Sequence, residues 1–382
     1  MYESELFAVA LPDGEIGYCS VMGFGGEHLA LALYVGNKGL DSFRLLQKAG
    51  EMHPLKAYES MLSQDCLQCS FEGKDTLSPQ ELSAVRDYTS RNRISIRGAN
   101  AFPQFMRFLP ATHPWPVSEQ ADIQLLCAAL QAVLEVNERV KDGEKLRLGF
   151  QEGPAYDRFV PLLVKAGQGV SWDRHPLPPI QAVQYLEPGL KDELLSARLR
   201  KAKKHGGTWV CDVALVPQPV MEDAVSVPIF PYTLLTAVCE SGMALPTEIV
   251  TDLEEEAEAL LRALGNRMLE HGVPKEIQVI NARTYAFLKN FAAALKIKLV
   301  LQPENDLLDE MEMDFLEYTT SQTADSVEED AALFAGMFLA LDDNSLLSMP
   351  DELWGQLRSL EQQGMLDEDV ARRLRLLSKR RK

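Results

Sequence analysis

The sequence predicts an acidic protein with an α+β domain of mainly antiparallel sheet, an α/β domain of mixed sheet and a helical tail. Its 382 residues exceed what one hydrophobic core of about 100–200 residues holds. The first 37 residues alternate short apolar runs with tight turns, as in a β-meander. From Thr208 onward strands and helices alternate, which is typical of a sheet with parallel members and right-handed crossovers.

The domain boundaries follow from charge and glycine content. We place an α+β domain at 1–190, a charged helix and hinge at 191–207, an α/β domain at 208–345 and a helical hairpin tail at 346–382. The hinge prediction depends on Gly206 and Gly207, which follow a strongly basic helix and offer a flexible, exposed link.

The elements of the first domain follow from apolar alternation and helix-capping signals. Ser78 followed by Pro79 indicates a helix start, and Ser118 precedes a long stripe of apolar residues at helical spacing. We expect strands at Glu5–Leu11, Glu15–Met22, His28–Val35, Cys66–Phe71, Leu146–Phe150, Val160–Ala166 and Ile180–Tyr185, with a further helix at Leu40–Ala49.

The second domain has the more regular order of elements. Thr251 with Glu254 three residues later forms a predicted capping box, and Gly272 with Pro274 ends that helix. We expect strands at Thr208–Val216, Val225–Leu234, Leu235–Cys239, Glu248–Val250, Glu276–Ile280 and Ile297–Leu301, and helices at Thr251–Gly272, Ala282–Leu295, Ala331–Leu341, Pro350–Gln363 and Asp367–Ser378.

Composition and charge exclude several classes of protein. No segment reaches the roughly 20 apolar residues of a membrane helix, and the amino terminus lacks the basic and apolar regions of a secretory signal. The formal net charge of −18 opposes binding to nucleic acid, because phosphate affinity comes largely from Lys and Arg. Six scattered cysteines favour buried thiols over a disulfide framework. These features predict a cytoplasmic protein without membrane or nucleic-acid partners.

Two short motifs receive structural interpretations. Cys66 and Cys69 have the spacing of half a zinc site, but no second pair of ligands accompanies them, so we expect core positions of a strand. The glycines at 23, 25 and 26 join two strands instead of opening a helix, so we expect a hairpin turn and no phosphate site.

One acid interrupts an apolar strand. In Trp209–Val213 the only charged residue is Asp212, and the phrase Gly272–Asn281 leads into a later strand. This order over residues 208–318 resembles the ribonuclease H-like fold of integrases and transposases. The resemblance implies a carboxylate on the first strand, one at the end of the fourth and one on a later helix, which together hold two metal ions.

The sequence departs from that pattern at the second carboxylate, where it has Asn281. A neutral amide is a weak ligand for a divalent ion, so we expect an inactive relative with no catalytic residue, no cofactor and no metal. The alternative is a metal-dependent nuclease or phosphoryl-transfer enzyme, in which Asp212, Asp306 and Glu310 would bind the metal. In the inactive relative, Asp212 is a structural acid that forms hydrogen bonds.

The whole chain also resembles an uncharacterised bacterial family that pairs two domains. The residues that carry this resemblance are Gly14–Gly23, Gly26–Gly36 and Trp209 with Asp212 and Val213. It implies a bacterial source and the same architecture. Together these observations predict a non-catalytic binding or scaffold protein whose partner is another protein or a small-molecule ligand.

Overall fold

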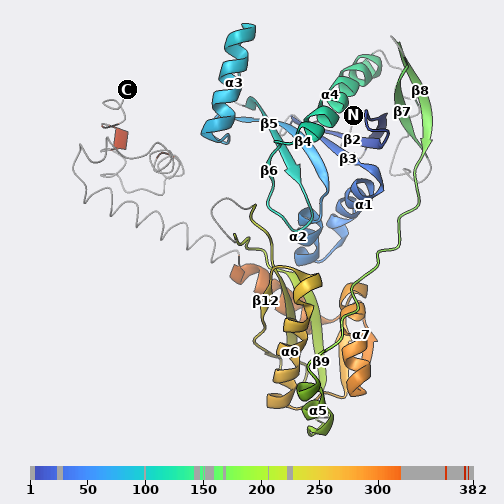
Figure 1. Cartoon of the computed structure of the whole chain (residues 1–382), viewed down its shortest axis with the longest axis vertical. Helices are drawn as coiled ribbons and strands as arrows, with labels where there is room; N and C mark the ends of the chain where they lie inside the picture. Colours follow the sequence, from blue (N-terminus) through green and yellow to red (C-terminus); the bar gives the residue numbers. More distant parts are fainter. Residues whose placement is uncertain are drawn as a thin grey trace. The chain divides into compact units, whose positions relative to one another are not determined.

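A computed structural model describes most of the chain (Figure 1). The described residues are 5–23, 29–98, 100–141, 147–148, 150, 159–166, 169–204, 206–221, 227–319, 358, 374–375 and 377. By compactness the chain divides into one unit of residues 1–313 and another of residues 314–382, and the first unit contains both sheets. The helices expected at Ala331–Leu341, Pro350–Gln363 and Asp367–Ser378 lie wholly or almost wholly outside the described residues.

The first domain contains a mixed sheet of eight strands in the order β6-β5-β4-β3-β2-β1-β7-β8. β1 pairs with β7 in parallel, and all other neighbouring pairs are antiparallel. The strands are β1 Leu6–Ala10, β2 Ile16–Met22, β3 Leu29–Val35, β4 Cys66–Gly73, β5 Asn100–Phe108, β6 Trp115–Pro116, β7 Phe159–Ala166 and β8 Gly169–Pro176. The predicted meander at the start of the chain is therefore confirmed as β1, β2 and β3.

Helices cover both faces of this sheet because successive strand residues point to opposite sides. Phe7 belongs to the core under α4 (Gln120–Lys141), whereas the next residue, Ala8, belongs to the core under α1 (Gly36–Gln47). Between α1 and β4 lie the short helix η1 (Ala49–Glu51) and α2 (Pro54–Leu62), and α3 (Pro79–Asn92) connects β4 to β5.

Two expectations for the first domain are settled by local sequence. The capping role of Ser78 is confirmed, because its hydroxyl accepts from the amide of Glu81 while the Glu81 carboxylate accepts from the amide of Ser78. The strand expected at Ile180–Tyr185 is wrong: residues 177–192 have no regular secondary structure. Three prolines within this segment lack the amide donor that a strand pairing needs. The strand expected at Leu146–Phe150 is not found either, because none of the three residues described there, 147, 148 and 150, is in a strand.

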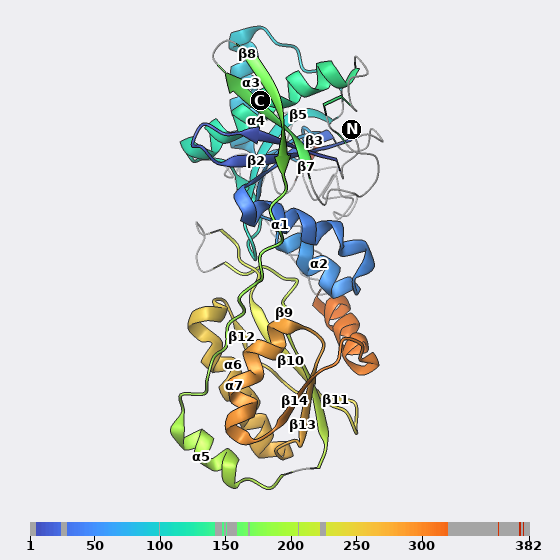
Figure 2. The ribbon, with the colours of Figure 1, turned by 90° about the vertical axis from the view of Figure 1, so that its right-hand side faces the viewer.

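The second domain has a mixed sheet in the order β11-β10-β9-β13-β14, with β12 also paired to β10 (Figure 2). β10 runs antiparallel to β9, whereas β13 and β14 run parallel to it. The elements are α5 Glu193–Lys201, β9 Thr208–Leu215, β10 Tyr232–Val238, β11 Met243–Ala244, β12 Ile249–Val250, α6 Leu253–His271, β13 Glu276–Val279, α7 Ala282–Leu295 and β14 Lys298–Leu301. Residues 306–319 are helical.

Two predicted element boundaries in this domain are corrected. The two strands expected at Val225–Leu234 and Leu235–Cys239 are one strand, β10, which begins at Tyr232 because Pro228 and Pro231 interrupt regular pairing before it. The amino-terminal cap of α6 is Asp252, one residue after the expected Thr251, and its carboxylate accepts from the amides of Glu254 and Glu255.

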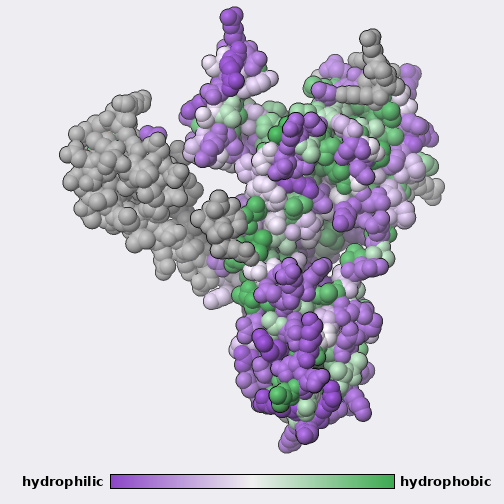
Figure 3. Space-filling view, viewed as in Figure 1, coloured by the Kyte–Doolittle hydropathy of each residue, from purple (hydrophilic) through white to green (hydrophobic). Residues whose placement is uncertain are grey.

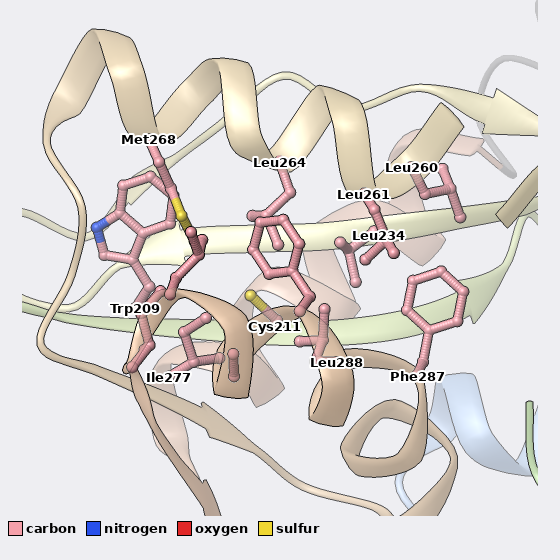
Figure 4. Close-up of a cluster of buried hydrophobic side chains, with 14 of the residues drawn as sticks. Trp209, Cys211, Leu234, Leu260, Leu261, Leu264, Met268, Ile277, Phe287 and Leu288 are labelled. Carbon is pink, nitrogen blue, oxygen red and sulfur yellow. The ribbon is translucent and has the colours of Figure 1, made fainter. Parts of the chain in front are cut away.

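The main core of the second domain lies between the sheet and helices α6 and α7 (Figure 4). Trp209, Cys211 and Val213 of β9 point into this core, because alternate residues of a strand share one face. α5 belongs to the same core. A Cβ added at Gly265 of α6 would lie 3.0 Å from Leu199 of α5, so the glycine allows the two helices to approach closely. The predicted segment 191–207 thus contains a helix that packs against the α/β domain.

The opposite face of the same sheet is covered by the helix that starts at residue 306. Val210 of β9 and Ala237 of β10 form a small buried cluster with Leu308 of that helix. Asp212 also lies on this face, two residues after Val210. No helix within the described residues is long and apolar enough to cross a membrane.

Candidate functional site

Asp212 lies near the middle of β9 and has no exposed surface. A buried carboxylate is costly unless hydrogen-bond donors and cations compensate the loss of water. Thr284 Oγ1 donates to Asp212 Oδ1 over 2.7 Å, and Asn281 Nδ2 donates to the same oxygen over 2.6 Å. Lys56 Nζ contacts the other oxygen, Oδ2. Both oxygens of Asp212 are therefore occupied by groups of the protein itself.

Asn281 joins this site to the start of α7. Its side-chain Oδ1 accepts a hydrogen bond of 2.9 Å from the amide of Thr284 and so caps the helix. Its Nδ2 faces Asp212, as described above. This position therefore uses an acceptor and a donor at once, which an amide provides and an ionised carboxylate does not.

The cations and one further acid come from α2 in the first domain and from α7 in the second. Lys56 and Glu59, three residues apart on α2, share one helix face. Glu59 Oε1 accepts from the amide of Leu215 over 2.8 Å. Arg283 Nη2 donates to the two Glu59 oxygens over 2.9 and 3.1 Å and also contacts the carbonyl oxygen of Val213. The site thus connects α2 to the end of β9.

Glu312 completes the cluster from the helix of residues 306–319. It follows the buried Leu308 by four residues, so it lies on the same helix face, and it has no exposed surface. Its Oε1 lies 3.3 Å from Lys56 Nζ and its Oε2 lies 3.1 Å from His53 Nδ1, but neither oxygen has a hydrogen bond of good geometry among the described residues.

The two carboxyl groups nearest Lys56 have pKa values shifted in opposite directions. Burial raises the pKa of Glu312 to about 8; Lys56 opposes this shift and the negative charge of Asp212 adds to it. Burial also acts to raise the pKa of Asp212, but Lys56, Arg283 and the hydrogen bonds from Lys56 and Thr284 outweigh it and hold that pKa below its ordinary value.

The cations respond to the same charges. Burial acts to lower the pKa of Lys56, but Asp212, Glu59 and Glu312 outweigh burial and raise it. The pKa of Arg283 is raised in the same way: burial acts to lower it, but the nearby carboxylates, mainly Glu59, outweigh burial. With Glu312 protonated, two carboxylates balance two cations. We name Lys56, Glu59, Asp212, Asn281, Arg283, Thr284 and Glu312 the charge cluster.

The structure separates the three acids of the metal-dependent alternative. Asp212 belongs to the charge cluster, whereas Asp306 and Glu310 are exposed to solvent. In the part of the chain that the structure describes, no group of three or more His, Cys, Asp or Glu side chains is arranged to hold a metal ion. The helix acid that approaches Asp212 is Glu312, two residues beyond Glu310.

Sequence reasoning overlooked four charged members of the cluster. Lys56, Glu59 and Arg283 carry no motif, and only their burial in the folded chain distinguishes them from surface residues. The burial of Glu312 could have been predicted from the sequence. Leu307, Leu308 and Met311 mark the apolar face of the helix, and Glu312 lies on that face. A search by helical phase would have selected Glu312 instead of Glu310.

The other motifs have structural roles. Cys66 and Cys69 are both buried in β4, but their spacing places Cys66 in the core under α1 and Cys69 in the core under α4. Burial raises the pKa of the Cys66 thiol to about 12 and that of Cys69 to about 11. The glycine cluster connects β2 and β3, an antiparallel pair, and its residues from 24 to 26 lie outside the described part.

Comparison with known proteins gives domains without an assigned activity. Residues 1–158 match the model of a domain of unknown function (DUF7309), and residues 195–316 match a second domain of unknown function (DUF6930). The chain fits an uncharacterised two-domain family. The charge cluster joins the two matches, because Lys56 and Glu59 lie in DUF7309 and the other five members lie in DUF6930. No curated protein matches the chain in sequence.

Proposed function

We propose that this protein is a non-catalytic binding or scaffold protein of the bacterial cytosol. In this proposal the second domain is a degenerate ribonuclease H-like domain, and Lys56 from the first domain occupies the position of a metal ion. The observation that carries the proposal is the contact of one ammonium group with carboxylate oxygens of both Asp212 and Glu312.

The topology of the second sheet supports the ribonuclease H-like assignment. Its central strand β9 carries Asp212, β10 runs antiparallel on one side, and β13 and β14 run parallel on the other. Asn281 follows β13, and Glu312 lies on a later helix that covers one face of the sheet. These are the three positions at which the resemblance implies carboxylates.

Electrostatics argue against a divalent ion beside Asp212. A metal ion beside Asp212 would lie close to the positive charges of Lys56 and Arg283, and like charges repel strongly in a buried site. The ion would also have to displace the hydrogen bonds of Thr284 and Asn281 from Oδ1. Lys56 provides a positive charge in place of a metal ion. Unlike a catalytic metal ion, an ammonium group has no coordination position at which a substrate could bind.

The cluster acts instead as a connection between the two domains. Glu59 of α2, in the first domain, accepts a hydrogen bond from the Leu215 amide and pairs with Arg283, both in the second domain. An ion pair and a hydrogen bond to the backbone thus connect the two domains. Backbone pairing strengthens it nearby: the amide of His113 donates to Pro228 and that of Phe230 donates to Ala111, each over 2.8 Å. A fixed relation between two domains suits a scaffold that presents one composite surface.

The test combines cleavage assays with removal of the internal cation. We expect the unaltered protein to leave DNA and RNA intact with Mg²⁺ or Mn²⁺, and its melting temperature to be unchanged by either ion. Lys56→Ala should melt lower and recover part of the loss with Mn²⁺, because two buried acids then lack their cation. Lys298→Ala, at a lysine that is 69% exposed, is the matched control and should show neither effect.

One result would overturn the non-catalytic proposal. Metal-dependent cleavage by the unaltered protein that disappears in Asp212→Ala, with the fold retained by circular dichroism, would establish Asp212 as a catalytic metal ligand. The metal-dependent enzyme would then be the correct interpretation.

A further inference from the structure

The first domain contains an apolar cavity that includes no residue of the charge cluster. Its volume is about 750 Å³, within the roughly 300–1,000 Å³ typical of small-molecule sites. Its lining comes from α3, from the strands β4, β5 and β6 of the sheet, and from α4, which contributes Cys127. Phe71 of β4 and Phe105 of β5 are part of this lining and are each about 40% exposed.

α3 is held in place without a core of its own. None of its 14 residues is buried, yet it is capped at its start by Ser78 and at its end by Arg93 in the left-handed conformation. It projects from the domain in Figure 1, and its outer surface is mainly hydrophilic in Figure 3. Ala84, Val85 and Tyr88 line the cavity. The apolar face of this helix is therefore turned toward a space that the described chain does not fill.

The chemistry of the lining selects the class of ligand. Among the described residues that line the cavity, the only charged one is Glu81, whose carboxylate already accepts from the Ser78 amide over 2.8 Å. The hydroxyl of Thr89 donates within its own helix to Val85 over 2.9 Å. This described lining contains no Lys or Arg, so an anion would meet no counter-charge from it and would be repelled by Glu81.

We infer that this cavity binds a small, neutral and mainly apolar molecule, such as one with a long acyl chain or fused hydrocarbon rings. The site is a partly open hollow lined by a helix, a sheet and a second helix, and a concave site suits a small molecule better than the flatter surface of a protein partner. The inference rests on the binding role proposed above and names the chemical class of its ligand. Burial of apolar surface that is now exposed to water would supply the binding free energy.

The experiment uses the neutral fluorescent probe N-phenyl-1-naphthylamine with the full-length protein. We expect saturable binding of one probe per chain, with displacement by dodecanol at a lower concentration than by dodecanoate, because Glu81 repels the anion. Val85→Asp places a charge in the cavity, and Ala84→Trp fills it. Each should weaken probe binding at least tenfold without a large change in melting temperature, because neither side chain is buried in the core.

Leu134→Asp is the matched control for Val85→Asp. Leu134 lies on α4, is 67% exposed and is outside the cavity lining, so this variant should bind the probe as the unaltered protein does. A second readout is alkylation of Cys127 by N-ethylmaleimide, which we expect bound dodecanol to slow.

The inference would be overturned by absence of saturable probe binding, or by equal binding by the unaltered protein and both cavity variants. A reversible dimer that is lost in Val85→Asp and excludes the probe would also overturn it, because a second copy would then be the occupant. These results are separable from the proposed function, since metal-dependent cleavage through Asp212 is measured without the probe.

Discussion

The side-chain Nδ2 of Asn281 donates a hydrogen bond of 2.6 Å to Asp212, while its Oδ1 caps α7. Asn281→Asp keeps the cap but turns a carboxylate oxygen toward Asp212 Oδ1. We expect this variant to lose about 1–3 kcal/mol in free energy of unfolding at neutral pH, because a donor is lost and like charges meet. Urea unfolding measures this loss.

Asn281→Ser separates the two roles of the amide. Serine is also a good cap, but its side chain is shorter and brings no second negative charge toward Asp212. Asn281→Ser should therefore lose less free energy of unfolding than Asn281→Asp. Added Mn²⁺ that raises the stability of Asn281→Asp above that of the unaltered protein would show that one carboxylate restores a metal site. Equal stability of Asn281→Asp and the unaltered protein would contradict the described hydrogen bond.

Lys56 and Asp212 form a buried pair, so removal of one partner leaves an uncompensated charge. We expect Lys56→Met and Asp212→Asn each to lower the free energy of unfolding by about 3–5 kcal/mol. The double variant should lose clearly less than the sum, because the two groups interact directly. Chemical denaturation of all four proteins gives the coupling energy, and strict additivity would contradict the contact.

Glu312 predicts a specific pH dependence. Its pKa is about 8 in the folded protein against an ordinary value of 4.5, so folding takes up a proton between these values. The free energy of unfolding should therefore fall as pH rises through this interval and level off above it, by at most about 1.4 kcal/mol per unit.

Glu312→Gln removes this contribution. The variant should be stabilised relative to the unaltered protein near pH 9, and the difference should shrink toward pH 5. Denaturant melts across this range provide the measurement. Glu310→Gln, on the exposed side of the same helix, is the control and should keep the slope of the unaltered protein.

The cysteines should differ sharply in reactivity. Cys127 is exposed, whereas Cys19, Cys66, Cys69 and Cys211 are buried. Burial raises the pKa of the Cys66 and Cys69 thiols to about 12 and about 11, so little thiolate exists near neutral pH. We expect Cys127 to be the first site of alkylation by mass spectrometry. A Cys66–Cys69 disulfide under mild oxidation would contradict their placement on opposite faces of β4.

Local patterns were enough to predict most elements of the second domain. The apolar run of β9, the acid-rich start of α6 and the glycine that ends it depend on neighbours within a few residues. Asp212 as a structural, hydrogen-bonded acid was also readable, because an acid inside an apolar strand must find donors. The same approach was wrong at residues 180–185, where the apolar residues Ile180, Val183 and Tyr185 are exposed and belong to no strand.

The partners of Asp212 could not be predicted in the same way. Lys56 lies 156 residues away in the sequence, and no periodic pattern links positions in different domains. Periodicity reports which face of an element is buried, but it does not report which distant element covers that face. The amide at 281 favoured a structural role for Asp212 over a metal site, yet only the folded chain identifies the ammonium group of Lys56 beside Asp212.

The pairing of Glu59 with Arg283 spans 224 residues and therefore has a consequence for synthesis on the ribosome. At about 5–20 residues per second, roughly 10–45 s pass between translation of the two partners. During that interval α2 has emerged with Lys56 and Glu59 still in contact with water. Charged groups keep such a surface soluble. Until the second domain is synthesised, the nascent first domain therefore exposes charged side chains, and not an aggregation-prone apolar patch, at this part of α2.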